Sequence, residues 1–284
     1  MLKADRVKIR EKLKLLQEGK KAIIATSAGV GITAKCQQAG GSDLILVDIS
    51  ARMRMAGFSS MAGFFAARNS NKLLTEQATE ILPLIQATPA LAGVAAGDPF
   101  QEIEKFLKQL AELGFSGVCN SPSLGWHDDF NAANLRTLGI GYEQEVEMLR
   151  LAKEMNLFTL GICYSAAQAK VMADAGVDGI VANLGLTAGG LIGAHTVLSP
   201  DDALRLAIEI AEAAKTARRD IFVLCTGAHL NSPAAVKEFL NSAGVLDGFC
   251  GGSATDRIPM EKGIVSITKS FKEARLYKSQ TSGI

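Results

Sequence analysis

The sequence lacks any long hydrophobic run, and no segment approaches the roughly 20 uninterrupted apolar residues that a membrane-spanning helix requires. Its first twenty residues, MLKADRVKIREKLKLLQEGK, intersperse charged side chains throughout and contain no apolar stretch of the kind that secretory signals have. We therefore expect a soluble protein of the cytoplasm.

A charge excess of either sign is also missing, because 30 lysines and arginines nearly balance 29 aspartates and glutamates. Such a chain has no global field that attracts nucleic acid or an anionic membrane. We therefore expect neither nucleic acid nor a membrane among its partners.

Several common site motifs are missing as well. The five cysteines, at positions 36, 119, 163, 225 and 250, include no close pair of the kind that zinc sites or redox motifs require, and we interpret them as reduced, small apolar residues. The chain has no nucleophile elbow, Walker-type P-loop or Rossmann glycine fingerprint. ATP hydrolysis and hydride transfer are therefore disfavoured, and no nucleotide or flavin cofactor is predicted.

The sequence does contain short β-rich runs that alternate with helical segments, which indicates a parallel sheet with helical crossovers. Eight such units within 284 residues match a single (β/α)8 TIM barrel, which typically takes about 250 residues. An open doubly wound sheet is the alternative fold. The predicted strands are 22–26, 44–48, 90–95, 116–119, 158–163, 179–183, 221–225 and 246–250.

The whole chain is predicted to be one α/β domain. Residues 1–20 are expected to form an extra N-terminal amphipathic helix across the barrel bottom, residues 21–275 the barrel, and residues 276–284 a flexible tail. Helices between the strands have apolar residues with a period of 3.6, as Phe106 and Leu110 illustrate, and this stripe is expected to cover the barrel wall.

Two connections, residues 49–73 and 120–142, are too long to be simple crossovers. Both follow the carboxyl end of a strand, where such barrels build their sites, so we expect a lid or a pocket wall there. The methionine- and phenylalanine-rich stretch Met53–Phe65 would expose apolar surface in a monomer, which favours a homo-oligomer.

Glycine-containing turns after the first strand form one candidate anion site. Ser27, Gly29 and Gly31 lie in a turn that leads directly into a helix, whose free N–H groups could hold a carboxylate or a phosphate. A tight turn that needs two flexible residues explains these glycines equally well.

A second candidate anion site lies near the end of the chain. Barrel phosphate sites are commonly made by the loops after strands 7 and 8, where this chain has Thr226, Gly227, Gly251, Gly252 and Ser253. The alternative is a glycine turn in which a hydroxyl side chain caps the next helix.

Charged residues follow the second and third strands. Arg52 and Arg54 could clamp an anionic substrate, although exposed arginines are usually only solvated. Asp48 and Asp98 could hold a hard cation or act as a general base. Asp98 precedes a proline, so it could equally be an ordinary helix cap.

Taken together, six segments resemble the phosphoenolpyruvate hydrolase-like family of barrel proteins. The likeness spans nearly the whole chain, and it is specific in combination. The segments are RMRMAG (52–57), TPALAGVAAGDPF (88–100), GFSGV (114–118), GYEQEVEM (141–148), GLTAGGLIG (185–193) and GGSATDRIP (251–259).

The resemblance implies a fold related to the phosphoenolpyruvate mutase and isocitrate lyase superfamily, and also to indole-glycerol-phosphate synthase barrels. It implies a site for a small 2-oxo acid, such as phosphonopyruvate, with cleavage of a P–C or C–C bond and Mg²⁺ as the cofactor. The carboxylates with which mutase-like enzymes end strands 3 and 4 are mostly missing here. Mg²⁺ would therefore depend on Asp48 and Asp98, while Asn120 would hydrogen-bond the oxo group.

Three functions remain open at this point. The first is a hydrolase or lyase that acts on a small anionic 2-oxo acid or a phosphoenolpyruvate-like substrate. The second is a non-catalytic barrel that senses a ligand or binds a protein. The third is a metal-independent phosphosugar enzyme, which a lysine at a strand end would support.

Overall fold

The computed structural model describes residues 5–64 and 69–276. Eight parallel strands close into a barrel in chain order, with β1 paired to both β2 and β8. The predicted (β/α)8 barrel is therefore confirmed, and the open sheet is excluded. The strands are β1 (Ile23–Ala28), β2 (Leu44–Val47), β3 (Ala90–Gly93), β4 (Gly117–Cys119), β5 (Phe158–Cys163), β6 (Gly179–Thr187), β7 (Phe222–Ala228) and β8 (Gly248–Gly251).

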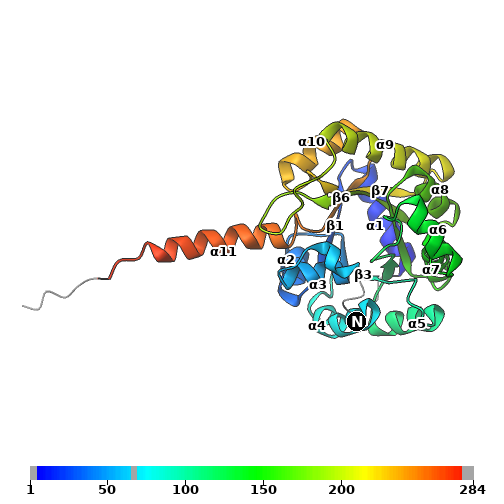
Figure 1. Ribbon diagram of the computed structural model, residues 1–284, viewed down its shortest axis with the longest axis horizontal. Coiled ribbons are helices and arrows are strands. Elements are labelled where there is room, and N and C mark those ends of the chain that lie inside the picture. The colour runs from blue at the N-terminus through cyan, green and yellow to red at the C-terminus, as the bar shows by residue number, and fades with distance from the viewer. Residues whose placement is uncertain (1–4, 65–68, 277–284) are drawn as a thin grey trace, which may run out of the picture.

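Helices surround the strands as an outer ring (Figure 1). Each packs an apolar stripe on the barrel wall; α5, for example, buries Phe106, Leu107 and Leu110. Burying one such side chain contributes about 2 kcal/mol. The ring consists of α2 (Gly31–Ala39), α4 (Ser70–Ile81), α5 (Ile103–Leu113), α7 (Tyr142–Glu154), α8 (Ala166–Asp174), α9 (Pro200–Ala217) and α10 (Pro233–Ala243).

The two long connections contain short helices at the carboxyl ends of the strands. The first includes α3 (Ile49–Met55) and the 3-10 turn η1 (Ser60–Gly63), whereas a second 3-10 turn, η2 (Leu82–Leu84), follows α4 and precedes β3. The second includes α6 (Asp129–Thr137). In the first, Met53 is buried against Ile49, which differs from the expectation of an exposed apolar surface. Phe58 is exposed, and Phe65 lies outside the described residues.

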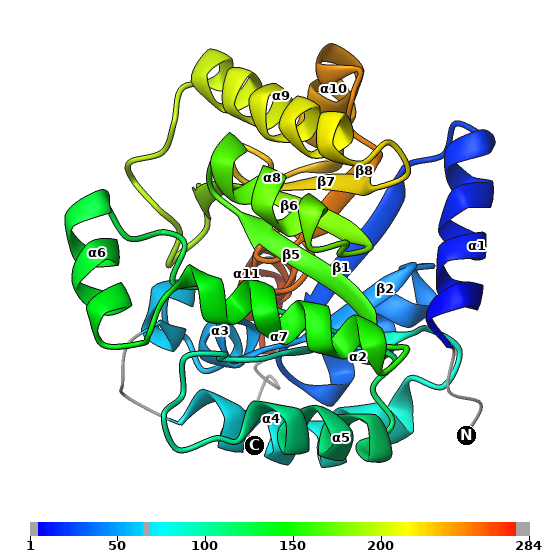
Figure 2. The ribbon, with the colours of Figure 1, turned by 90° about the vertical axis from the view of Figure 1, so that its right-hand side faces the viewer.

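Helix α1 (Arg6–Glu18) lies at the opposite end of the barrel from α6 (Figure 2). Its Ile9 and Leu13 join the cluster of side chains that fills the barrel interior. Arg6 and Arg10 pair with the buried Asp178 just before β6, at 2.7 and 2.8 Å. This helix therefore closes the bottom of the barrel and leaves the other end for a site.

Helix α11 (Arg257–Lys272) follows β8 and projects away from the barrel (Figure 1). The predicted tail from residue 276 onward lies, except for Leu276, outside the described residues. Among the described residues, no helix is both long and apolar enough to cross a membrane.

Candidate active site

A cavity of about 360 Å³ opens at the carboxyl ends of the strands. Other hollows of the molecule are larger, but they lie on the outer wall and the bottom, whereas barrels of this class build their sites here. Among the described residues, Asp48 and Arg54 are the charged side chains that line it. Hydroxyl groups supply much of the remaining polar lining, from Ser27, Ser50, Ser60, Ser121, Tyr164, Thr187, Thr226 and Ser253.

Arg54 is buried in the last turn of α3, where three partners fix its guanidinium. Nε donates to Asp256 Oδ2 at 2.7 Å, Nη2 donates to Ser27 Oγ at 2.5 Å, and Nη1 donates to Ser60 Oγ at 3.1 Å. Burial raises the pKa of the Asp256 carboxyl, although Arg54 beside it acts in the opposite direction. The arginine is thus held in one orientation by residues from three other parts of the chain.

Asp48 ends β2 and caps α3. Its Oδ1 accepts from the backbone N of Ala51 at 2.7 Å, and its Oδ2 accepts from Ser121 Oγ at 3.1 Å. Gly93 of β3 makes room for this contact, because an added Cβ would lie 2.5 Å from the Cβ of Asp48 and 3.1 Å from the carbonyl oxygen of Ser121. Three neighbouring strand ends therefore fit together around one carboxylate.

Aromatic side chains form part of the cavity wall. The rings of Phe64 and Trp126 meet edge to face with centroids 5.8 Å apart, and His127 stacks on Trp126 at 4.4 Å. Met61 and Leu186 add aliphatic surface. The cavity is therefore amphipathic, with one fixed cation and many hydroxyls beside an apolar wall.

A buried carboxylate supports the loop that carries Ser121 and Trp126. Glu145 of α7 accepts hydrogen bonds from Leu124 N at 2.5 Å, Ser123 Oγ at 2.7 Å and Asn120 Nδ2 at 2.5 Å. Burial without a cation raises the pKa of Glu145 to about 7, and these three donors only partly offset the effect.

The buried cysteines are unsuited to nucleophilic chemistry at neutral pH. Burial raises the pKa of Cys250, which lines the cavity, to about 12, and it raises the pKa of Cys119 well above its usual value. A thiolate is the reactive form, so Cys250 stays a protonated, small side chain.

The structure brings together six of the residues that the sequence singles out. They come from the ends of β1, β2, β7 and β8, as the barrel closure requires. The six that line the cavity are Ser27, Asp48, Arg54, Thr226, Gly252 and Ser253.

The remaining predicted glycines serve packing rather than the cavity. A Cβ on Gly29 would collide with the carbonyl of Ala51, one on Gly31 with Leu84, and one on Gly251 with Thr255. Gly227 has a positive φ of 96° and lies against the backbone of Gly185. These contacts explain why the positions are glycine, as the tight-turn alternative expects, and anion binding by their backbone N–H groups stays a prediction.

Arg52 does not join Arg54 in a clamp, because residues two apart on a helix point in different directions. Its Nη1 lies 3.5 Å from Glu80 Oε2, outside the cavity lining.

Asp98 and Asn120 also lie outside the lining. Asp98 accepts from Asn71 Nδ2 at 3.2 Å and from Phe100 N at 3.0 Å, so it stabilises a turn; Glu102, rather than Asp98, precedes the following helix. Asn120 is fully buried, and its Oδ1 accepts from the backbone N of Ile162 at 2.6 Å while its Nδ2 contacts Glu145. Its amide links the ends of β4 and β5 and is not free to contact an oxo group.

These positions bear directly on a Mg²⁺ site, which the resemblance implies. Of the described residues, Asp48 is the one carboxylate that lines the cavity, and Asp98 lies outside the lining. No group of three or more His, Cys, Asp or Glu side chains within residues 5–64 and 69–276 is arranged to hold a metal. The donor set therefore does not fit a Mg²⁺ held by Asp48 and Asp98.

Several lining residues were not assigned a role from the sequence, although four of them lie in the long connections that were expected to form a lid or a pocket wall. These four are Ser50, Ser60, Ser121 and Trp126, and the others include Tyr164 and Asn183. Tyr164 directly follows a predicted strand and Asn183 ends another, so their positions in the sequence could have identified them as lining residues. Ser60 and Trp126 lie within the long connections, whose course the sequence does not specify. The described lining contains no lysine, so the feature that would support the phosphosugar enzyme is not found there.

The chain resembles proteins of known sequence over nearly its full length. It is 40% identical over 267 residues to the ToMV susceptible protein tm-1(GCR26) of Solanum lycopersicum, a match that covers 94% of this chain and 35% of the tomato protein. The chain thus spans about a third of the length of that relative.

Solved structures share the fold at low sequence identity. A 2,3-dimethylmalate lyase of the PEP mutase/isocitrate lyase superfamily is 12% identical with a TM-score of 0.58, covering 96% of this chain and 91% of that one. A phosphonopyruvate hydrolase solved with oxalate and Mg²⁺ is 12% identical with a TM-score of 0.57, covering 96% and 92%.

The sequence also matches the phosphoenolpyruvate hydrolase-like family over residues 8–274, as the six segments predicted. This match covers nearly all of the barrel and agrees with the superfamily fold of the structural neighbours. The chain therefore belongs to the phosphoenolpyruvate hydrolase-like family.

Proposed function

We propose that this chain is a hydrolase or lyase that acts on a small anionic 2-oxo acid in the strand-end cavity. The observation that carries the proposal is the buried guanidinium of Arg54, whose orientation Asp256, Ser27 and Ser60 fix. A preorganised guanidinium is well suited to binding a carboxylate. The similar hydrolase that was solved with oxalate supports the same ligand class.

The free hydrogen-bonding capacity of the site defines how the acid is held. Nε and Nη2 of Arg54 already donate to Asp256 and Ser27, whereas Nη1 has two N–H groups and one donates to Ser60. The carboxylate of the substrate is held by the second N–H of Nη1 together with neighbouring serine hydroxyls. The apolar wall of Phe64 and Trp126 accommodates a hydrocarbon substituent on the same acid.

Asp48 is the proposed proton acceptor. For an acylpyruvate, it takes a proton from water, the water oxygen bonds to the acyl carbon, and the bond from that carbon to C3 breaks. The electron pair passes to the enolate of pyruvate, which Arg54 stabilises and which takes the proton back from Asp48 at C3. The products are a carboxylic acid and pyruvate. No step is assigned to Mg²⁺, because the cavity residues do not fit that ion.

The experiment is a turnover assay with purified protein. Pyruvate release is measured from acylpyruvates, oxaloacetate, phosphonopyruvate and phosphoenolpyruvate, with Mg²⁺ and with EDTA, for the wild type, Asp48→Asn and Arg54→Lys. Turnover of one substrate that both variants lose supports the proposal. No turnover of any of the four contradicts it.

A non-catalytic, ligand-sensing barrel is the second candidate. The observation in its favour is that the cavity has a single carboxylate and a protonated thiol, which is little catalytic machinery. Saturable binding of oxalate or pyruvate without turnover of any of the four substrates would favour this function over the first.

A further inference from the structure

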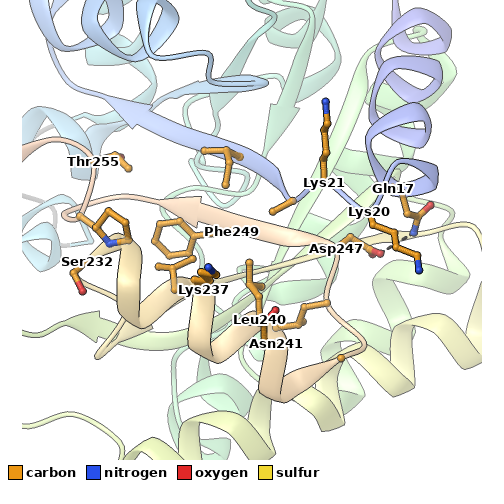
Figure 3. A pocket seen from close by; sticks show the side chains of 17 residues that line it. Gln17, Lys20, Lys21, Ser232, Lys237, Leu240, Asn241, Asp247, Phe249 and Thr255 are labelled. Carbon is orange, nitrogen blue, oxygen red and sulfur yellow. Dashed lines mark hydrogen bonds between the residues drawn. The ribbon is translucent and has the colours of Figure 1, made fainter.

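A groove of about 670 Å³ lies on the outer wall, between α10 and the outer faces of β8 and β1 (Figure 3). Its fixed polar side chains bond within the described structure. Asp247 accepts from Gln17 Nε2 at 2.7 Å, and the hydroxyls of Ser232 and Thr255 bond backbone atoms. The lysines that line the groove are exposed. The polar groups of this groove thus hold the fold together, and they differ in this respect from a set of groups in the strand-end cavity.

That set comes from the consecutive strands β5, β6 and β7. Tyr164 directly follows β5, Asn183 lies in β6 and Thr226 lies in β7, and all three line the cavity. Cys163 is in register with Ala182, so Tyr164 is level with Asn183, which is itself in register with Thr226. Side chains at level positions of neighbouring strands point to the same side of a sheet. The three residues therefore form one polar layer that faces the barrel axis.

Asn183 presents its amide nitrogen to the cavity. Its Oδ1 accepts from the backbone N of Gly185 at 3.0 Å, and this bond fixes the orientation of the amide because only the oxygen can accept. Within residues 5–64 and 69–276, Nδ2 has no hydrogen-bond partner and is not enclosed by protein atoms. Its N–H groups are therefore available to a ligand.

Tyr164 presents its hydroxyl to the same space. Its backbone N donates to Gln168 Oε1 at 2.8 Å, and Gln168 Nε2 donates to the carbonyl of Gly125 at 2.7 Å, so the residue is tied to the loop above it. In the described ranges the hydroxyl has no partner and is not enclosed. Burial raises the pKa of this phenol, and the nearby Glu145 adds to the effect. The phenol therefore stays protonated and can donate.

The reaction proposed above requires donors of this kind. When the oxygen of water bonds to the acyl carbon, the electron pair of the carbonyl bond moves to the acyl oxygen, which becomes an oxyanion. Arg54 holds the carboxylate at the other end of the substrate, beside Ser27 of β1. In a barrel closed in chain order, β5 and β6 lie opposite β1 and β2. A substrate anchored at Arg54 therefore directs its acyl carbonyl toward the polar layer.

We propose that Tyr164 and Asn183 form the oxyanion site of this reaction, with the phenol hydroxyl and Nδ2 both donating to the acyl oxygen. The inference rests on the proposed function. The oxyanion re-forms its carbonyl bond as the bond from the acyl carbon to C3 breaks, and the released pair passes to the enolate of pyruvate, which takes the proton back from Asp48. Donors aimed at a developing charge bind the transition state more tightly than the ground state, so they raise kcat.

Steady-state kinetics on the acylpyruvate that the wild type turns over tests this assignment. Tyr164→Phe and Asn183→Leu each remove a donor and nearly preserve the shape of the side chain. We expect each to lower kcat about 100-fold or more, since loss of one oxyanion donor costs roughly 10²–10³. KM is expected to stay within about threefold, and urea unfolding is the control for folding.

Tyr142→Phe is the matched control for the loss of a tyrosine hydroxyl. The hydroxyl of Tyr142 donates to the carbonyl of Ile162 at 2.8 Å, and Tyr142 does not line the cavity. Its kcat is expected to stay within about threefold of the wild type.

A binding experiment gives a readout that is independent of turnover. The probe is the methylphosphinate analogue of acetylpyruvate, in which a tetrahedral phosphorus with charged oxygens replaces the acyl carbon. Trp126 fluorescence is expected to show a Kd at least tenfold weaker in Tyr164→Phe than in the wild type, because such analogues resemble the transition state. The Kd for oxalate is expected to be unchanged, since two carboxylates alone end before the polar layer.

The outcomes separate this inference from the function on which it rests. An equal phosphinate Kd in wild type and Tyr164→Phe would overturn it, as would an unchanged kcat in folded Tyr164→Phe and Asn183→Leu. If Arg54→Lys loses turnover while Tyr164→Phe keeps it, the proposed function stands and the oxyanion site does not. No turnover of any substrate by the wild type removes both.

Discussion

The guanidinium of Arg54 and the carboxylate of Asp256 form a buried ion pair, with Nε and Oδ2 2.7 Å apart, between the helix that follows β2 and the segment that follows β8. The pair fixes the position of the cavity's cationic group. It also connects the first and last parts of the barrel, on either side of the seam where β1 pairs with β8. Removing one partner of a buried pair typically costs 3–5 kcal/mol, since the other charge is left unpaired. Substitutions here therefore have to separate loss of fold from loss of function.

Arg54→Lys keeps the positive charge but removes the planar fork that bonds Asp256, Ser27 and Ser60 at once. We expect kcat/KM for the substrate to fall about 100-fold or more, which is about 2.7 kcal/mol of lost stabilisation. Steady-state kinetics measures this effect, and urea unfolding is the control for folding. An unchanged kcat/KM in a folded Arg54→Lys protein would refute the role given to Arg54.

Asp48→Asn and Asp98→Asn form a matched pair. Both remove one negative charge after a neighbouring strand, but only Asp48 lines the cavity. We expect Asp48→Asn to lower kcat at least 100-fold, because general-base catalysis contributes roughly 10²–10⁴. Asp98→Asn is expected to retain kcat within about threefold. Equal losses in the two variants would mean that Asp98 acts in the reaction.

Gly93→Ala tests the close approach beneath Asp48. The added methyl group would lie 2.5 Å from the Cβ of Asp48, so that Asp48 and Ser121 must separate. Overpacking of this kind typically costs 1–3 kcal/mol, and we expect a comparable fall in the free energy of unfolding together with lower activity. Chemical denaturation measures the first effect, and Gly252→Ala, where an added Cβ has ordinary contacts, is the control. Equal stability of the two variants would contradict the packing argument.

The sequence was sufficient to predict the barrel. Strands and helices alternate along it, and each type of element has its own spacing of buried apolar side chains. Asp48, Arg54 and Ser27 were also identifiable, since parallel strands end at the same rim. What the sequence did not specify was the direction of each side chain within a loop. The sequence does not distinguish Arg52 from Arg54, yet of these two side chains only that of Arg54 lines the cavity.

Glu145 shows a second limit of sequence analysis. Its segment carried the family resemblance, but a role for one carboxylate among three glutamates depends on its burial under residues 120–125. The direction of α11 was likewise not predictable, because the spacing of its apolar residues predicts a helix but does not specify the surface on which that helix packs.

The raised pKa of Glu145 predicts a pH-dependent stability. Folding raises this pKa from 4.5 to about 7, so between these values the folded state binds more protons than the unfolded state. Stability from this group is fully present below pH 4.5 and is lost as the pH rises through 7. A shift of this size corresponds to roughly 3 kcal/mol.

Urea unfolding of wild type and Glu145→Gln at pH 5 and pH 8 measures the effect. The difference in unfolding free energy, wild type minus variant, is expected to be smaller at pH 8 than at pH 5. A pH-independent difference would show that Glu145 titrates normally in the folded protein.

The central claim is that Arg54 anchors a small carboxylate ligand in the strand-end cavity, and the chain's single tryptophan offers the most direct measurement. Trp126 lines that cavity, so its fluorescence reports on occupancy independently of turnover. Titration with oxalate is expected to give a saturable change in the wild type, a Kd at least tenfold weaker in Arg54→Lys, and an unchanged Kd in Asp98→Asn. A saturable change of equal affinity in Arg54→Lys, or no change in the wild type, would contradict the claim.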